Sequence, residues 1–183
     1  GFPSPKVERY RYAKVETDFS PNYGIALTPI KGPLPPHCFR IADAVPQART
    51  LYNKVADRAD SIVALNTMLC VDTLVVHVPK GTRVEHPIQI SNTLKGEQDT
   101  MVCRRILIIM EELAQADVII TDRATSQSRF LTNQVIEVVM HDSSHLCLYE
   151  TEETHLLCTR YSSVFVQQGR NSTFHHTNLT LFN

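Results

Sequence analysis

Four apolar runs recur at regular intervals along the chain: Leu74-Val75-Val76-His77-Val78, Ile106-Leu107-Ile108-Ile109-Met110, Val135-Ile136-Glu137-Val138-Val139-Met140 and Ser163-Val164-Phe165-Val166. They are rich in β-branched residues, which favour strands. After each run come a short polar stretch and a second strand-forming run; the second runs lie at 84–90, 117–121, 145–149 and 172–181. The sequence therefore predicts four strand–turn–strand units.

The spacing of these units indicates a solenoid. If Val78, Ile109, Val139 and Val166 are equivalent, the offsets between units are 31, 30 and 27 residues. A fixed period in this range is typical of stacked repeats, in which no unit can bury its apolar face alone. The turns lack Asn-Gly and Asp-Gly pairs, so we expect corners between strands and not hairpins.

Two kinds of β-solenoid compete. A left-handed helix of hexapeptides needs a six-residue rhythm of apolar and small residues, which we do not find. A right-handed parallel β-helix with coils of about thirty residues fits the period better. We therefore predict a mainly β fold, a right-handed parallel β-helix preceded by a short helical N-terminal region. The run 106–110 is apolar throughout, as expected for a strand covered on both faces.

Composition narrows the function. The formal charge of −1 argues against a nucleic-acid or membrane-surface partner, either of which would favour a basic excess. No apolar run approaches the roughly 20 residues that cross a bilayer, and the start lacks a signal-peptide pattern. Five cysteines without a CxxC pair fit reduced thiols better than a disulfide framework. We expect a cytoplasmic protein.

The first third of the chain has a different character. Residues 1–20 mix charged and apolar side chains after Pro3 and Pro5, which predicts a short helix. Residues 21–47 hold six prolines and two glycines, so we expect a loop or linker there. A helix is predicted over 48–59. Asp60 or Ser61 is a candidate cap for a further short turn through Leu65.

One cluster contains metal-ligating residue types. His145 and Cys147 alternate by two, so on a strand they project from one face. His155 and Cys158 follow a few residues later, near Glu152 and Glu153. Thiolate, imidazole and carboxylate groups together could hold zinc or iron. The spacing lacks the regularity of a metal motif, and the competing interpretation places Cys147 in the core and His145 in a polar niche.

Other chemistry is weakly indicated. Asp142, Ser143 and His145 contain the residue types of a hydrolytic triad, but sequence neighbours seldom produce its geometry. A carbohydrate-active enzyme such as a polysaccharide lyase would use acidic residues and a base on one coil face. The candidates are Glu150, Glu152, Glu153 and Arg160, and nothing in the other coils supports them.

The remaining histidines also fail to form a site. His175 and His176 should point to opposite faces of one strand. His77 and His86 lie on either side of the first corner without an obvious partner.

Several stretches resemble the SufB/SufD family of iron–sulfur cluster assembly scaffold proteins. The opening segment shares Pro3, Lys6, Glu8 and Tyr12 with the SufD pattern, with Tyr10 where that pattern commonly has Trp. Further matches run along the chain: Ala64-Leu65-Asn66-Thr67, Asp72, Val78-Pro79-Lys80-Gly81, Glu85-x-Pro87-Ile88 and Arg105 to Glu111. Thr73 replaces an expected glycine. The N-terminal match is most like SufD.

The resemblance implies a non-enzymatic scaffold subunit of the SUF complex that binds a SufB paralogue and the SufC ATPase, with a homodimer as a further possibility. Family members are longer and continue into more coils and a helical domain. We therefore expect the SufC-docking helices and much of the SufB-facing surface to lie beyond Asn183. No catalytic, cofactor-binding or metal-binding residue is carried over to this chain, and any iron–sulfur cluster would be handled by the full complex. We expect residues 1–66 to form the N-terminal helical and loop region and residues 67–183 the coils.

Overall fold

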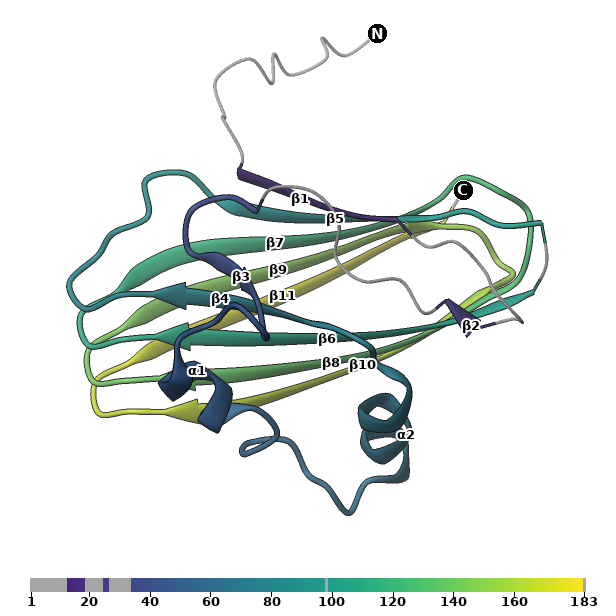
Figure 1. Ribbon diagram of the computed structural model, residues 1–183. Helices are drawn as coiled ribbons and strands as arrows, with labels where there is room; N and C mark the ends of the chain where they lie inside the picture. Colours follow the sequence, from purple (N-terminus) through teal and green to yellow (C-terminus); the bar gives the residue numbers. More distant parts are fainter. Residues whose placement is uncertain (1–12, 19–24, 27–33, 98, 183) are drawn as a thin grey trace, which may run out of the picture.

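In a computed structural model, described for residues 13–18, 25–26, 34–97 and 99–182, the chain forms a parallel β-solenoid with short helices before it (Figure 1). The described strands build two facing sheets. Four coils each contribute one strand to each sheet, and the pairing between coils is parallel throughout. The predicted mainly β solenoid and its corners are confirmed. None of the described helices has the length and hydropathy needed to cross a bilayer.

The two sheets are named here after a central strand of each. The β7 sheet has the order β1 (Ala13–Asp18), β5 (Ile88–Leu94), β7 (Gln115–Ala124), β9 (His145–Thr154) and β11 (Thr173–Phe182). The β6 sheet has the order β10 (Cys158–Gln168), β8 (Phe130–Met140), β6 (Thr100–Met110), β4 (Thr73–Val78) and β3 (Cys38–Arg40). The short strand β2 (Ile25–Ala26) also pairs with β6.

The sequence predicted which residues of successive coils are equivalent, and at two positions the observed strand register differs from that prediction by one residue. Ile109 does pair with Val139, but Val78 pairs with Met110, and Val139 pairs with Gln167. Following Val78 through the stack gives offsets of 32, 30 and 28 residues. Because these runs are apolar at consecutive positions, hydrophobicity alone cannot tell one register from its neighbour.

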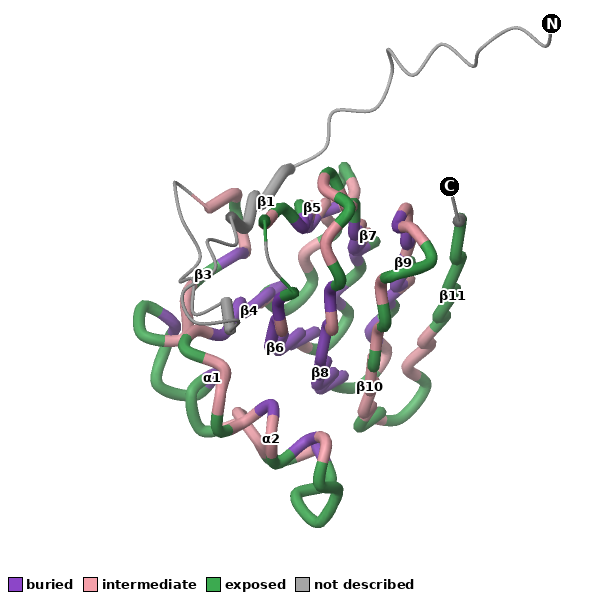
Figure 2. Tube along the Cα trace, turned by 90° about the vertical axis from the view of Figure 1, so that its right-hand side faces the viewer, coloured by how far each residue is buried: buried purple, intermediate pink, exposed green. Residues whose placement is uncertain are grey.

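The core lies between the sheets, and Figure 2 shows the buried positions along the strands. Parallel pairing places like residues above one another, as in Ile106 with Ile136 and Met110 with Met140. Ile106, Ile108 and Met110 point into this core, whereas Leu107 and Ile109 point outward. The outward pair is buried beneath Ala44 and the helix α1 (Pro46–Leu51). The prediction that this run is covered on both faces is confirmed.

The N-terminal segment adds strands to the first two coils. The helix predicted over 1–20 is wrong at 13–18, which is β1; residues 1–12 and 19–20 lie outside the described residues. Residues 21–47 include β2 and β3, so the predicted loop is only partly correct, and 21–24 and 27–33 also lie outside. Pairing with the exposed edge of a sheet satisfies backbone groups and outweighs local propensity.

Both helices lie against the outer face of the β6 sheet (Figure 1). α1 ends at Leu51, short of the predicted 48–59, because Asn53 has a positive φ and the amides of the next residues bind a glutamate of the sheet. Of the two candidate caps, Asp60 is the N-cap of the helix α2 (Ser61–Leu69), and its side chain accepts hydrogen bonds from the amides of Ile62 and Val63. The helix continues past the predicted end at Leu65.

Candidate functional site

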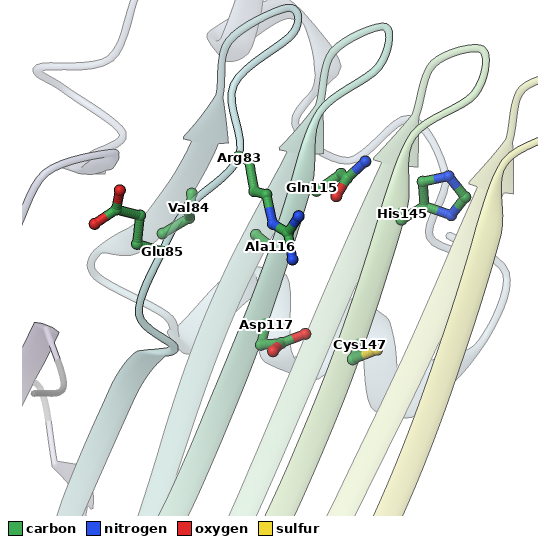
Figure 3. A pocket seen from close by; sticks show the side chains of 8 residues that line it. All are labelled: Arg83, Val84, Glu85, Gln115, Ala116, Asp117, His145 and Cys147. Carbon is green, nitrogen blue, oxygen red and sulfur yellow. The ribbon is translucent and has the colours of Figure 1, made fainter. Parts of the chain in front are cut away.

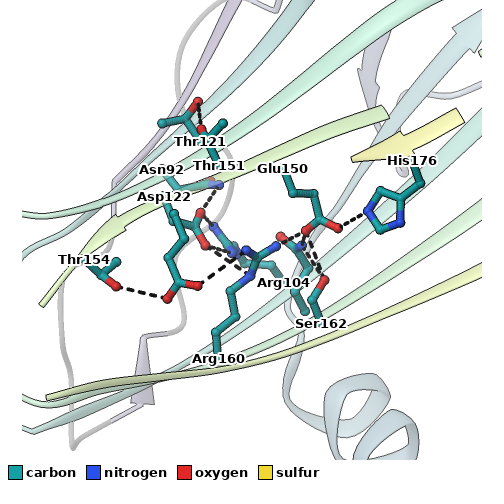
Figure 4. Close-up of polar contacts among 12 residues, drawn as sticks. Asn92, Arg104, Thr121, Asp122, Glu150, Thr151, Thr154, Arg160, Ser162 and His176 are labelled. Atoms are coloured by element: carbon teal, nitrogen blue, oxygen red, sulfur yellow. Dashed lines mark hydrogen bonds and ion pairs between the residues drawn. The ribbon is translucent and has the colours of Figure 1, made fainter. Parts of the chain in front are cut away.

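A layer of charged and polar side chains crosses the interior of the solenoid (Figure 4). Strand alternation points these side chains inward, because residues two apart on a strand face the same side. Glu150 lies two residues after the core residue Leu148, and Arg104 lies two residues before the core residue Ile106. The layer lies between the main apolar core and a smaller apolar cluster at the far strand ends that includes Phe130. Buried charges in such a layer must be paired to be tolerated.

One half of this interior charge layer is centred on Asp122. The guanidinium of Arg104 donates to both of its carboxylate oxygens, at 2.5 and 2.6 Å. The side-chain amide of Asn92 donates to the same carboxylate at 2.8 Å, and Nε of Arg160 lies 3.6 Å from it. Burial alone would raise the pKa of Asp122, but the two arginines and Asn92 hold it below its ordinary value. Asp122 is therefore a carboxylate.

The other half is centred on Glu150, from the next coil. Arg160 and Gln134 both donate hydrogen bonds to Oε2 of Glu150, and the bond from Gln134 is 2.8 Å long. Nε2 of His176 is hydrogen-bonded to Oε1 at 2.8 Å. Ser162 also donates to this carboxylate at 3.1 Å. The pKa of His176 is lowered by burial and by the charge of Arg160. Residues from all four coils thus share one network of hydrogen bonds and ion pairs, which fixes the stagger of the coils.

Three buried atoms of the layer have no hydrogen-bond partner among the described residues. They are Nε of Arg104, Nε of Arg160 and Oε1 of Gln134. The pKa of the neighbouring Glu152 is raised by burial and by the nearby charge of Asp122. Buried polar atoms normally find partners, so these two donors and one acceptor are the unsatisfied groups of an otherwise paired layer.

A second buried ion pair holds the N-terminal segment to the outer face of the β6 sheet. Arg105 and Glu137 are completely buried, with Nη2 of the arginine 2.7 Å from the glutamate. Glu137 also accepts hydrogen bonds from the backbone amides of Asn53, Val55 and Ala56 at 2.8 to 3.0 Å. We call Arg105, Glu137 and these three amides the clasp. The sequence showed Glu137 only as an interruption of an apolar run.

The four candidate metal ligands do not come together. His145 and Cys147 lie at the start of β9, whereas His155 and Cys158 follow its last residue. The two ends of this ten-residue strand are about 30 Å apart, given the usual rise per residue of a strand. Within the described part of the chain, no three His, Cys, Asp or Glu side chains form a group that could hold a metal ion. His155 and Cys158 do meet, with 3.7 Å between Nε2 and Sγ.

The competing prediction for Cys147 is also wrong. Leu146 and Leu148 take the inward positions of β9, so Cys147 and His145 lie on the outer face of the sheet. His175 occupies the same outer row as Cys147, and His176 faces the interior, so the prediction of opposite faces is confirmed. His77 does have a partner, because its Nε2 lies 2.8 Å from Glu111.

The residues considered for a lyase are divided between two surfaces. Glu150, Glu152 and Arg160 meet inside the solenoid, where Asp122 of an earlier coil joins them through Arg160. Glu153 lies outside and pairs with Arg123. A polymer cannot reach the buried set. The triad residue Asp142 accepts a hydrogen bond from the amide of Arg170, and no described bond joins it to His145.

Comparison with known protein families gives two matches that follow each other along the chain. Residues 40–90 match the SufBD protein N-terminal region. Residues 92–183, half of the chain, match the SufBD core domain, described as SUF system FeS cluster assembly. No curated protein and no solved structure matches the chain.

Proposed function

Because the chain belongs to the SufBD family of SUF-system iron–sulfur cluster assembly proteins, we propose that it acts as the SufD-like subunit of that system. In this role it is a scaffold that binds a SufB paralogue and the SufC ATPase. The iron–sulfur cluster is cargo of the assembled complex and is not a resident cofactor of this chain.

The SufD assignment rests on the opening segment of the sequence. Pro3, Lys6, Glu8 and Tyr12 stand where the SufD pattern has the same residues. This segment lies outside the described residues, so sequence resemblance alone supports the choice of SufD over SufB.

The observation that carries the scaffold role is the match of residues 92–183 to the SufBD core domain of SUF system FeS cluster assembly. The surface also offers large apolar side chains to a partner, since Leu179 and Leu181 on β11 and Tyr161 on β10 are about half exposed.

The interior charge layer supports a scaffold role over an enzymatic one. Its carboxylates Asp122 and Glu150 are each bound by arginine, amide or imidazole groups from neighbouring coils. Groups that are engaged in this way stabilise the relative position of coils, and a rigid stack presents a fixed surface to partners.

Co-purification tests the proposal. The full-length protein, tagged and co-expressed with the SufB and SufC homologues of its own organism, should retain both untagged partners through size-exclusion chromatography. A second purification, with the tag moved to the SufB homologue, distinguishes the two roles. In that experiment a SufD-like subunit should be recovered as the untagged partner of SufB. Recovery of the tagged protein without SufB and without SufC would contradict the proposal.

A further inference from the structure

A hollow of about 190 Å³ opens on the outer face of the β7 sheet (Figure 3). It exists because the chain leaves the sheet just before β5. Arg83 bridges to Gln115, and the next pair is Ile88 with Val118, so four residues on one side oppose two on the other. Pro87 within this bulge has no amide hydrogen to give to the sheet. Bulges of this kind are common beside functional sites.

The hollow gathers ionisable side chains, and three of them have no side-chain partner among the described residues. Arg83, Glu85, Asp117 and His145 line it and are exposed, with Cys147 beside Asp117. No described hydrogen bond or ion pair involves the side chain of Arg83, Glu85 or His145. Some exposed charged groups elsewhere on the surface do have partners, as in Lys80 with Glu112 and Arg123 with Glu153.

The arrangement of charge defines the ligand class. Figure 3 shows the Arg83 guanidinium above Asp117, with the Cys147 thiol on the adjacent strand. A guanidinium binds a carboxylate through two parallel hydrogen bonds, and a carboxylate binds an ammonium group. A ligand that carries both an ammonium and a carboxylate on neighbouring atoms matches this pair. The volume, below the roughly 300 Å³ of drug-sized pockets, restricts such a ligand to a few heavy atoms beyond those charges.

We propose that this hollow binds a small zwitterionic α-amino acid, whose carboxylate pairs with Arg83 and whose ammonium group pairs with Asp117. Gln115 and His145 provide further polar contacts at the rim, and Cys147 lies beside the bound ammonium group. This site is separate from the interior charge layer and does not depend on the SUF role proposed above.

Cys147 supplies a built-in reporter. It is partly exposed and lines the hollow, whereas Cys38 and Cys103 are buried in the protein interior. Burial and then the charge of Asp117 raise the pKa of the Cys147 thiol. A bound ligand blocks access to this thiol, so ligand binding should slow its alkylation. Cys158, which is also partly exposed but lies beyond the far end of β9, is an internal control.

The experiment measures alkylation of the full-length protein by iodoacetamide, with the rate at each cysteine followed by peptide mass spectrometry. L-alanine should slow labelling of Cys147 in a saturable manner and leave Cys158 unchanged. N-acetyl-L-alanine, which lacks the ammonium charge, and L-alaninamide, which lacks the carboxylate, should each require at least about tenfold higher concentration, the factor for one charged hydrogen-bonded contact.

Two exposed arginines of the same face provide matched variants. Arg83→Ala should weaken protection by L-alanine at least about tenfold, whereas Arg123→Ala should leave it unchanged. The proposal is overturned if L-alanine gives no protection at millimolar concentration, if the blocked analogues protect equally well, or if both variants behave like the parent protein.

Discussion

The clasp makes the strongest prediction about stability. Replacing Glu137 by glutamine keeps the shape of the side chain and removes its charge. The carboxylate is completely buried and serves Arg105 and three backbone amides, of Asn53, Val55 and Ala56. After the change one amide nitrogen faces these donors, and Arg105 is left as a buried cation without a counter-ion.

The size of the effect follows from these contacts. Removing one partner of a buried ion pair costs about 3–5 kcal/mol, most of it from the charge left behind. Arg105 retains hydrogen bonds to Thr67 and Asn53 and lies over the ring of Tyr52, which favours the lower end of that range. We therefore expect Glu137→Gln to lower the free energy of unfolding by about 3 kcal/mol.

Urea unfolding followed by circular dichroism at neutral pH measures this change. The matched control is Glu153→Gln, which breaks the exposed pair with Arg123 and should cost less than about 1 kcal/mol. Hydrogen exchange should also quicken at the amides of Asn53, Val55 and Ala56. A loss below about 1 kcal/mol for Glu137→Gln, or unchanged exchange at those amides, would refute the reasoning.

Three further predictions follow from the same contacts and from the corners. Burial opposes ionisation of Glu137, but Arg105 and the clasp amides hold its pKa below the ordinary 4.5. The stability that the ionised carboxylate contributes is present above the ordinary pKa and is lost as the pH falls through the folded-state pKa. Urea titrations between about pH 6 and 3 should therefore show a smaller loss of unfolding free energy on acidification in Glu137→Gln than in the parent protein. A methyl group on Gly169 would lie 2.7 Å from the backbone nitrogen of Asp142, so thermal or urea unfolding of Gly169→Ala should show a loss of about 1–3 kcal/mol, and an unchanged midpoint would contradict the close approach. Leu113 is half exposed and has a φ of 62°, a backbone conformation that is unfavourable for every residue except glycine. Leu113→Gly should therefore raise the unfolding free energy by about 0.5–1 kcal/mol. A loss of stability in urea unfolding would contradict this.

The repeated architecture could be predicted because it depends on a pattern within the sequence. Each coil carries its own apolar strand and corner, and the corners share a residue with positive φ: Gly81, Leu113, Ser143 and Asn171. Only one of these four is glycine, so the sequence offered no uniform corner signal. The register also escaped prediction, since a run such as 106–110 has no polar residue to mark its inward face.

The interior charge layer could be predicted only in part. Glu150 and Glu152 keep the inward phase of Leu146 and Leu148, and this alternation was a usable signal. Their partners were not accessible in the same way, because Gln134 lies 16 residues before Glu150 and His176 lies 26 residues after it, and both meet it only through the folding and stacking of the coils. The hollow beside β5 depends on a bulge of two residues, and a small change in strand pairing of this kind leaves no periodic trace.

The most direct test of the central claim is the activity of iron–sulfur enzymes in cells that depend on the SUF system. The full-length protein should restore aconitase activity in a strain lacking SufD and should fail in one lacking SufB. Failure in the strain without SufD, although the protein is folded and expressed, or rescue of the strain without SufB would contradict the account.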